Sequence, residues 1–177
     1  MKKIIIYFCL VGVVLADYPE KIHLKCNDNA ASTAVSDNGD FSQSITASVN
    51  TDTMSASGKI GNAFSFNGTS SRYLLGGYDS TLDTGIGTVC LWFKPASIGE
   101  NSLIAFGANT GSRYDWNMRA NCGGNELWGE LGGIGGNVRA SGVPYSTSAW
   151  IHLAVVQNGS SAVVYTNGVL STSMDNR

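Results

Sequence analysis

The chain has 177 residues and a mass of 18.6 kDa, a length typical of one domain with a full hydrophobic core. Only 14% of its residues are charged, 43% are hydrophobic and 22 are glycine, which excludes a coiled coil, a collagen and a disordered chain. The net charge is −2 and no cluster of Lys and Arg follows residue 16, so the electrostatic signature of nucleic-acid binding is missing. This composition favours short strands joined by Gly, Asn and Ser turns.

The first sixteen residues have the pattern of a secretory signal peptide. Lys2 and Lys3 form a basic start, and an apolar run follows over residues 4–15. Val14 and Ala16 are the small residues expected before a cleavage site. Because the apolar run is shorter than the ~20 residues of a membrane-spanning helix, the sequence predicts cleavage after Ala16 and no transmembrane segment. The mature chain, residues 17–177, is therefore expected to be secreted or held at the cell surface.

The rest of the chain predicts short strands separated by turn residues, with no sustained helical periodicity. In chain order the expected strands cover residues 22–26, 63–66, 72–75, 87–94, 102–106, 114–120, 126–131, 150–157, 162–166 and 169–171. Asn-Gly pairs that begin at Asn67, Asn158 and Asn167 mark tight turns. The Ser- and Thr-rich stretch 32–57 is expected to be a long loop, with one edge strand near 44–49. This spacing of strands indicates a sandwich or a barrel within a single domain.

Three cysteines follow the leader, at Cys26, Cys90 and Cys122, so at most one internal disulfide can form in an oxidising compartment. Their spacing does not select the pair. Asn67 and Asn158 begin Asn-x-Ser/Thr sequences, which fit N-glycosylation and fit hairpin turns equally well. The disulfide pairing, the glycosylation of these sites and the oligomeric state stay open.

Four motifs occur in a fixed order. Residues 150–156 read Trp-Ile-His-Leu-Ala-Val-Val, and a later strand, 163–169, ends in Asn-Gly-Val. Earlier, residues 58–68 read Gly-Lys-Ile-Gly-Asn-Ala-Phe-Ser-Phe-Asn-Gly, and residues 89–95 read Val-Cys-Leu-Trp-Phe-Lys-Pro. The opening strand with the loop aspartate at residue 37 completes the set. This order resembles the laminin-G-like domains of the concanavalin A-like lectin/glucanase superfamily over about residues 21–172.

The resemblance implies an all-β jelly-roll sandwich of two antiparallel sheets. It also implies core positions for Trp92 and Trp150 and a structural role for His152. Domains of this family continue into closing strands after the turn that corresponds to Asn167, whereas this sequence ends at Arg177. The resemblance therefore predicts that closing strands are missing, which would leave an unpaired sheet edge.

One candidate ligand-binding face comes from two neighbouring strands. In each strand the candidates occupy alternate positions, which share one face of a sheet. The candidate residues are Arg113, Asp115, Asn117, Arg119, Glu126, Trp128 and Glu130. An exposed aromatic ring beside carboxylates and amides suits a sugar, because the ring covers the apolar face and the polar groups hold the hydroxyls. The expected partner is a carbohydrate or a glycosylated surface.

Two other functions stay open. An extracellular protein-interaction, adhesion or structural module would present an extended apolar patch instead. A fragment of a glycoside hydrolase would use Glu126 and Glu130 as its pair of carboxylates. Residue 128 between them is Trp128, however, and not the aspartate that would separate the two pKa values. No Gly-x-Ser-x-Gly motif is present either, so the chain is expected not to be an enzyme.

Calcium is the candidate cofactor. Asp37, Asn38 and Asp40 surround the flexible Gly39, and Asp28 lies nearby in the sequence. Ca²⁺ takes 6–8 oxygen ligands from carboxylates, amides and carbonyls, which such a cluster supplies. The same run of residues is also a plain turn signal.

Overall fold

The computed structural model describes residues 4–7, 22–68, 72–77, 86–97, 101–106, 116–120, 127–131, 136–140, 146–158 and 161–173. The chain divides into two compact units. Unit 1 comprises residues 1–77 and 91–96, and unit 2 comprises residues 78–90 and 97–177. The long strand β7 (Ile86–Pro95) contributes its first half to unit 2 and its second half to unit 1. The leader and the single domain over 17–177 stay predictions.

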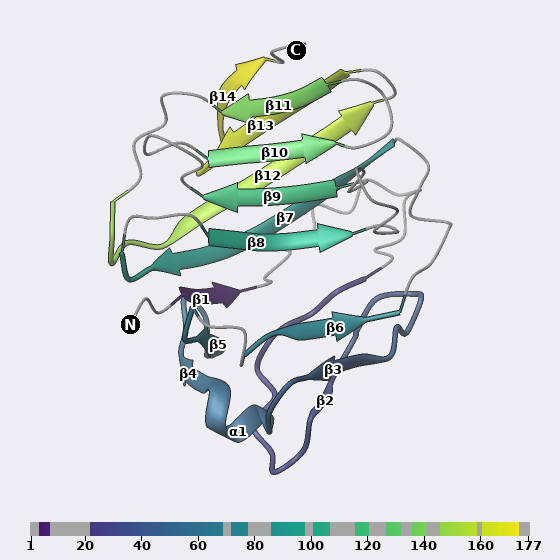
Figure 1. Ribbon diagram of the computed structural model, residues 1–177, viewed down its shortest axis with the longest axis vertical. Coiled ribbons are helices and arrows are strands. Elements are labelled where there is room, and N and C mark those ends of the chain that lie inside the picture. Colours follow the sequence, from purple (N-terminus) through teal and green to yellow (C-terminus); the bar gives the residue numbers. More distant parts are fainter. Residues whose placement is uncertain are drawn as a thin grey trace. The chain divides into compact units, whose positions relative to one another are not determined.

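Unit 1 contains strands of two antiparallel sheets and one short helix, α1 (Thr51–Met54) (Figure 1). The three-stranded sheet has the order β2 (Ala34–Val35), β3 (Ile45–Ala47) and β6 (Leu74–Gly76). The other has the order β4 (Ser55–Ser57), β5 (Asn62–Phe66), β1 (Ile4–Tyr7) and the second half of β7. All of these pairs are antiparallel, as the sequence predicts.

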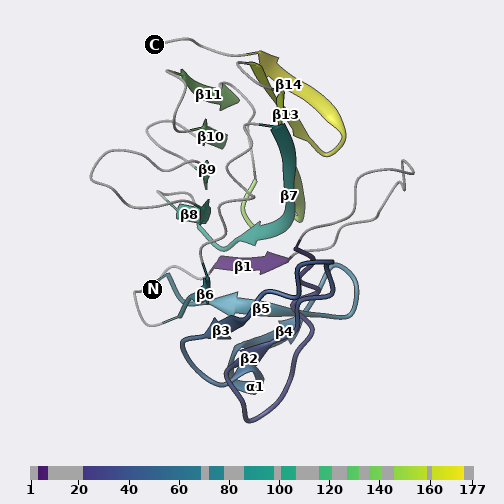
Figure 2. The ribbon, with the colours of Figure 1, turned by 90° about the vertical axis from the view of Figure 1, so that its right-hand side faces the viewer.

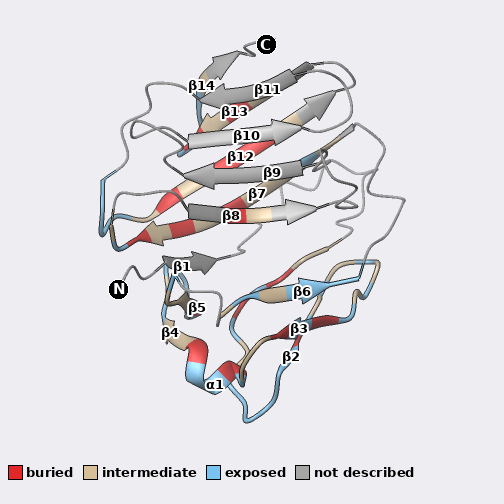
Figure 3. Cartoon of the chain, viewed as in Figure 1, coloured by how far each residue is buried: buried red, intermediate tan, exposed pale blue. Residues whose placement is uncertain are grey.

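Alternate residues of a strand point to the same side of the sheet, and in unit 1 the apolar residues on one side form the core. On β3, Ile45 and Ala47 are buried and Thr46 between them is exposed. Phe64 on β5 and Met54 on α1 have no exposed surface. Figure 3 shows buried segments in β3 and α1. The buried cluster is Leu24, Cys26, Val35, Ile45, Ala47, Met54 and Phe64.

The prediction of a long loop over residues 32–57 is wrong, because this stretch contains β2, β3, α1 and β4. The expected edge strand is β3, which lies between β2 and β6 and is the central strand of its sheet. Tertiary hydrogen bonds hold this polar stretch: the buried Thr51 hydroxyl donates to Ala30 O and accepts from Ala30 N, both at 3.1 Å. The strand expected over 22–26 is reduced to a single bridge between Leu24 and Asp37.

Unit 2 contains a four-stranded antiparallel sheet and a second layer of strands. The sheet has the order β11 (Gly136–Ala140), β10 (Leu127–Leu131), β9 (Trp116–Ala120) and β8 (Asn101–Phe106). The second layer has the order β14 (Val169–Ser173), β13 (Ser161–Thr166), β12 (Ile151–Asn158) and the first half of β7. Figure 2 shows β8 to β11 edge-on, with β13 and β14 in the layer that faces them. This arrangement confirms the predicted all-β sandwich.

Both layers of unit 2 contribute buried apolar residues. The residues that are buried there include Leu103 on β8 and Ile151, Leu153, Val155 and Val164 on the facing strands. On β12 the buried positions include every second residue from Ile151 to Val155, as expected for a strand with one face in the core. Apolar burial of this kind supplies most of the stability of a β-sandwich.

The hairpin between β13 and β14 turns at Asn167-Gly168, as the sequence predicts. Both residues have positive φ angles, 51° and 79°, which a tight Asn-Gly hairpin turn requires. Asn167 also reaches β12: its Oδ1 accepts from His152 N at 2.9 Å, and its own N–H donates to His152 O at 2.8 Å. Asn167 therefore fixes the turn and ties it to the neighbouring strand.

We expect Asn167→Ala to lower the free energy of unfolding by about 2 kcal/mol. The alanine loses the hydrogen bond to His152, worth about 1 kcal/mol, and adopts a positive φ at a cost of about 1 kcal/mol. Urea denaturation measures this change. Asn167→Gly is the control, because glycine accepts the positive φ and loses only the amide, so about half of the destabilisation should remain. Equal losses in both variants would contradict a conformational role for Asn167.

Candidate functional site

Strands β9 and β10 bring four of the predicted ligand-binding residues together. Their backbones pair so that Trp128 lies opposite Arg119 and Glu130 lies opposite Asn117. Residues directly opposite each other in an antiparallel pair share a face, with Cβ atoms about 4.5–5.5 Å apart. One aromatic, one basic, one acidic and one amide residue therefore occupy adjacent positions on one face. We call these four residues, Asn117, Arg119, Trp128 and Glu130, the polar face.

The register extends the polar face onto β11, which the sequence reasoning missed. Trp128 pairs with Arg139 and Glu130 pairs with Asn137. The signal was present, since polar residues alternate with small or apolar ones along Gly136–Ala140. Because no strand was expected over residues 136–140, this alternation was not matched to a neighbouring strand.

The opposite face of the same strands carries the complementary pattern. Its register positions are apolar or small, which is the composition of the inner face of a sandwich sheet: Trp116, Met118, Leu127, Gly129, Leu131 and Val138. This alternation of residue types is the one expected of a sheet with one polar and one apolar face. Arg113, Asp115 and Glu126 lie outside the described residues, so the structure does not place the predicted carboxylate pair of Glu126 and Glu130.

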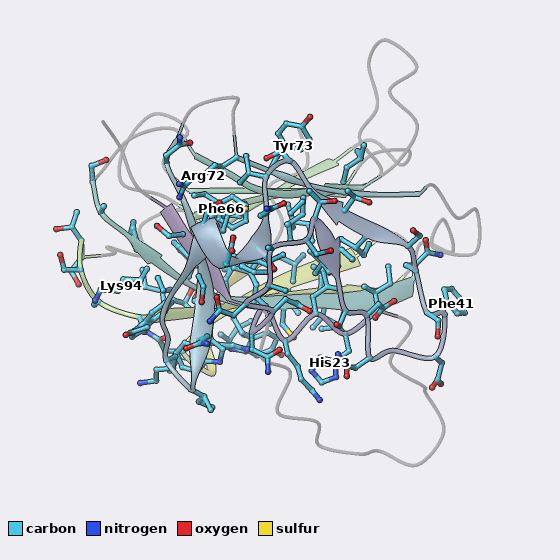
Figure 4. The ribbon with its side chains drawn as sticks, turned by 90° about the horizontal axis from the view of Figure 1, so that it is seen from below. His23, Phe41, Phe66, Arg72, Tyr73 and Lys94 are labelled. Carbon is cyan, nitrogen blue, oxygen red and sulfur yellow. The ribbon has the colours of Figure 1, made fainter. Side chains whose placement is uncertain are left out.

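The predicted calcium loop is organised by a single carboxylate. Asp37 Oδ1 accepts from His23 N at 2.8 Å and from Gly39 N at 2.9 Å, and Oδ2 accepts from Gln43 N at 2.7 Å. Asn38 N donates to His23 O at 2.8 Å beside them. Asp37 therefore joins the segment that begins at residue 22 to the loop over residues 37–43. His23, labelled in Figure 4, supplies one of these backbone donors.

The hydrogen bonds set the charge state of Asp37. Partial burial would raise the pKa of this carboxyl, but three backbone donors, from His23, Gly39 and Gln43, lower it more strongly. The positive charge that His23 can carry lowers the pKa of Asp37 further. Asp37 is therefore an anion at all physiological pH values, with both oxygens engaged by the protein.

The other predicted calcium ligands do not converge on Asp37. Asp28 Oδ1 accepts from Ser36 N at 3.1 Å and from Ser36 Oγ at 2.6 Å, and its buried Oδ2 has no hydrogen-bond partner. Asn38 and Asp40 are exposed. Within the described ranges, no three or more His, Cys, Asp or Glu side chains form a group that could hold a metal ion. Calcium therefore stays a prediction.

The backbones of both histidines, His23 and His152, take part in hydrogen bonds that join separate segments of the chain. His152 is the second residue of β12, and its backbone N–H and C=O both form hydrogen bonds with Asn167. Its partial burial lowers the pKa of the imidazole, because a desolvated ring favours the neutral form. The backbone N–H of His23 is likewise committed to Asp37. These contacts fit the structural role that the sequence predicts for His152.

Trp92 differs from its expected place in the core. Its neighbours Leu91 and Phe93 are fully buried, whereas Trp92 is only partly buried, because successive residues of β7 alternate between the two faces. Lys59 Nζ lies 5.3 Å from the centroid of the Trp92 ring, in the geometry of a cation–π contact. Trp150 is also only partly buried.

Comparisons with known proteins agree with this architecture. A family model of the laminin G type, described as the concanavalin A-like lectin/glucanases superfamily, matches residues 67–176. A solved structure, Domain 4 of AbnA, a GH43 extracellular arabinanase from Geobacillus stearothermophilus, in complex with arabinotriose, is similar with a TM-score of 0.63. Its sequence identity is 23%, and the match covers 90% of this chain and 76% of that chain, which shows a shared fold.

No curated protein matches the sequence. In the part of the chain that the structure describes, no helix has the length and hydropathy to cross a membrane.

Proposed function

Because the chain belongs to the concanavalin A-like lectin/glucanase superfamily, we propose that it is a secreted, non-catalytic module that binds a carbohydrate. The observation that carries the proposal is the polar face, in which Trp128 pairs with Arg119 and Glu130 pairs with Asn117. A tryptophan ring covers the C–H face of a sugar, and flanking charged and amide groups hydrogen-bond its hydroxyls. The arabinotriose in the similar arabinanase domain supports a short oligosaccharide as the ligand class.

The non-catalytic part of the proposal rests on which groups the register brings together. Glu130 pairs with Asn117 and Asn137, so amides lie on both sides of this carboxylate position. A retaining glycosidase needs a second carboxyl group about 5–5.5 Å away. Amide neighbours bind sugars but do not supply the second acid or base, which favours recognition over hydrolysis.

We expect Trp128→Ala to weaken arabinotriose binding at least tenfold in a calorimetric titration, a loss of about 1.4 kcal/mol. The lost ring removes the apolar contact, while the polar partners remain. Tyr73→Ala is the matched control, since Tyr73 is an exposed aromatic residue, 51% accessible, next to β6 in unit 1. It should bind as the wild type does. Unchanged binding in a folded Trp128→Ala variant would remove the polar face from the proposal.

An adhesion or protein-interaction module is the second candidate, and the exposed apolar residues favour it. Val169 and Leu170, which adjoin at the start of β14, are 68% and 57% exposed. Exposed apolar side chains gathered on a surface mark protein contacts. A protein partner captured by the wild type and lost in Val169→Ser/Leu170→Ser, with glycan binding absent, would favour this candidate.

Calcium dependence has its own test. Asp28 Oδ2 is a buried carboxylate oxygen without a hydrogen-bond partner, so it is the atom at which we test for a cation. If calcium binds there, Ca²⁺ should raise the melting temperature of the wild type, EDTA should reverse the rise, and Asp28→Ala should abolish it. A melting temperature that changes with neither Ca²⁺ nor EDTA would exclude calcium as a cofactor.

A further inference from the structure

Asn-Gly pairs, which begin at residues 38, 67, 158 and 167, are chemically reactive positions in this chain. In such a pair the backbone nitrogen of the glycine attacks Cγ of the asparagine side chain, because glycine has no Cβ to hinder the approach. The attack closes a succinimide ring and releases ammonia, and water then opens the ring to aspartate or isoaspartate. In a folded chain the rate depends on how readily the two reacting atoms reach this geometry.

The pair at Asn167 is locked by hydrogen bonds. Asn167 Oδ1 accepts from His152 N at 2.9 Å, and Asn167 N donates to His152 O at 2.8 Å. Asn167 and Gly168 also have the positive φ angles of the tight turn between β13 and β14. Rotation of the amide toward Gly168 N would break the bond to His152 and disturb the hairpin. We therefore expect this pair to react slowly.

The pair at Asn38 is held less firmly. Asn38 is exposed, and its side-chain amide forms no hydrogen bond within the described residues. Its backbone alone is bound, since Asn38 N donates to His23 O at 2.8 Å. The side-chain carbon that is attacked can therefore turn toward Gly39 N without the loss of a hydrogen bond.

One hydrogen bond restrains the attacking atom. Gly39 N donates to Asp37 Oδ1 at 2.9 Å, and this N–H must be released and lose its proton before the nitrogen attacks. The carboxylate of Asp37 is too weak a base to take an amide proton, because the two groups differ widely in pKa. Its negative charge also disfavours the negatively charged nitrogen. Asp37 therefore slows the attack and does not prevent it.

We propose that Asn38 is the deamidation site of the folded chain and that Asp37 limits its rate by holding Gly39 N–H. Hydroxide from the solvent removes the proton of Gly39 N, the bond from this nitrogen to Cγ forms, and the bond from Cγ to the side-chain nitrogen breaks. Ammonia leaves with a proton from water, and hydrolysis of the ring leaves a carboxylate at residue 38. The loop over residues 37–43 thus gains a negative charge beside Asp37. This modification is independent of the polar face of β9 and β10.

The test incubates the folded chain at mildly alkaline pH and follows each Asn-Gly pair by peptide mapping, in which deamidation adds about one dalton. We expect residue 38 to convert at least about tenfold faster than residue 167 in the same sample. In urea both residues should convert rapidly, because unfolding removes their restraints. Equal rates at the two residues in the folded chain, or an unreactive residue 38, would overturn the proposal.

Gly39→Ala is the control for the attacking atom. Gly39 has no positive φ, so its backbone conformation accepts alanine, while the added Cβ hinders the approach of the nitrogen. Conversion at residue 38 should slow roughly tenfold. An unchanged rate in this variant would show that the reaction does not pass through Gly39 N and would overturn the proposal.

Asp37→Ala tests the restraint. It should speed conversion at residue 38 several-fold and leave residue 167 slow. Residue 167 reports on folding in the same sample, because an unfolded chain would convert at both residues. If Asp37→Ala does not fold, Asp37→Asn gives the same comparison, since it removes the charge and keeps an acceptor oxygen. An unchanged or slower conversion at residue 38 in a folded variant would overturn the role of Asp37.

Discussion

Replacing Phe64 by alanine is expected to lower the free energy of unfolding by about 3–5 kcal/mol. Phe64 has no exposed surface and packs in the buried cluster of unit 1 with residues that include Met54 and Ile45. Truncation removes the transfer free energy of the ring and leaves a cavity that surrounding strands close only in part. Urea denaturation with an unchanged m-value measures the loss as a lower midpoint.

Phe66→Ala is the matched control for this prediction. Phe66 lies on the same strand, but it is only partly buried at the border of the cluster. Its truncation should cost roughly half as much, because less apolar surface returns to water. Equal losses at both positions would mean that unit 1 is not organised around Phe64.

Replacing Asp37 by alanine is expected to cost about 2–3 kcal/mol at neutral pH. The change removes three hydrogen bonds from a carboxylate to backbone N–H groups, and bonds to charged groups are worth about 1.5–3 kcal/mol each. The loop is partly exposed, so water recovers part of the loss. Thermal unfolding of the variant measures it. Ser36→Ala is the control, because it removes a hydroxyl that bonds only to the exposed side of Asp28 and should cost less than 1 kcal/mol.

The Asp37 contribution depends on pH in a defined direction. Its pKa in the folded chain lies below the ordinary value of 3.8, so the unfolded chain binds the proton more tightly. The stabilisation is complete above about pH 5, where the carboxyl is ionised in the unfolded chain too, and it disappears as the pH falls through the folded pKa. The difference in stability between the wild type and Asp37→Ala should therefore shrink in acid. A difference that stays constant from neutral pH to pH 2 would show that Asp37 does not act through its charge.

The best-predicted parts of the fold are the strands with strong local signals. The bounds expected for β5, β7, β12 and β13 agree with the structure within one or two residues. Each has alternating or continuous apolar residues next to a turn or a proline, which local reasoning detects. The prediction for residues 32–57 is wrong because hydrogen bonds to residues distant in the sequence hold this stretch in place. The bonds between Thr51 and Ala30 are an example, and no local pattern reveals them.

The sequence indicates which residue types could form the candidate site, but it does not indicate which residues lie opposite one another in the sheet. Alternation along the sequence places Asn117 and Arg119 on one face of a strand, and Trp128 and Glu130 on one face of the next. Their mutual register depends on loops whose closure the sequence does not specify, and so does the addition of Arg139 from β11. The prediction for Trp92 is wrong for a different reason. The family resemblance assigned it to the core, whereas its alternation with the buried Leu91 and Phe93 already indicated the other face.

We propose that the polar face of β9 and β10 binds a glycan. A glycan array probed with the secreted chain, its Trp128→Ala variant and its Tyr73→Ala variant tests it most directly, with Ca²⁺ and with EDTA. All three samples must first unfold cooperatively. We predict one reproducible class of bound glycans, lost in Trp128→Ala and retained in Tyr73→Ala. No bound glycan, or the same glycans bound by Trp128→Ala, would contradict the account.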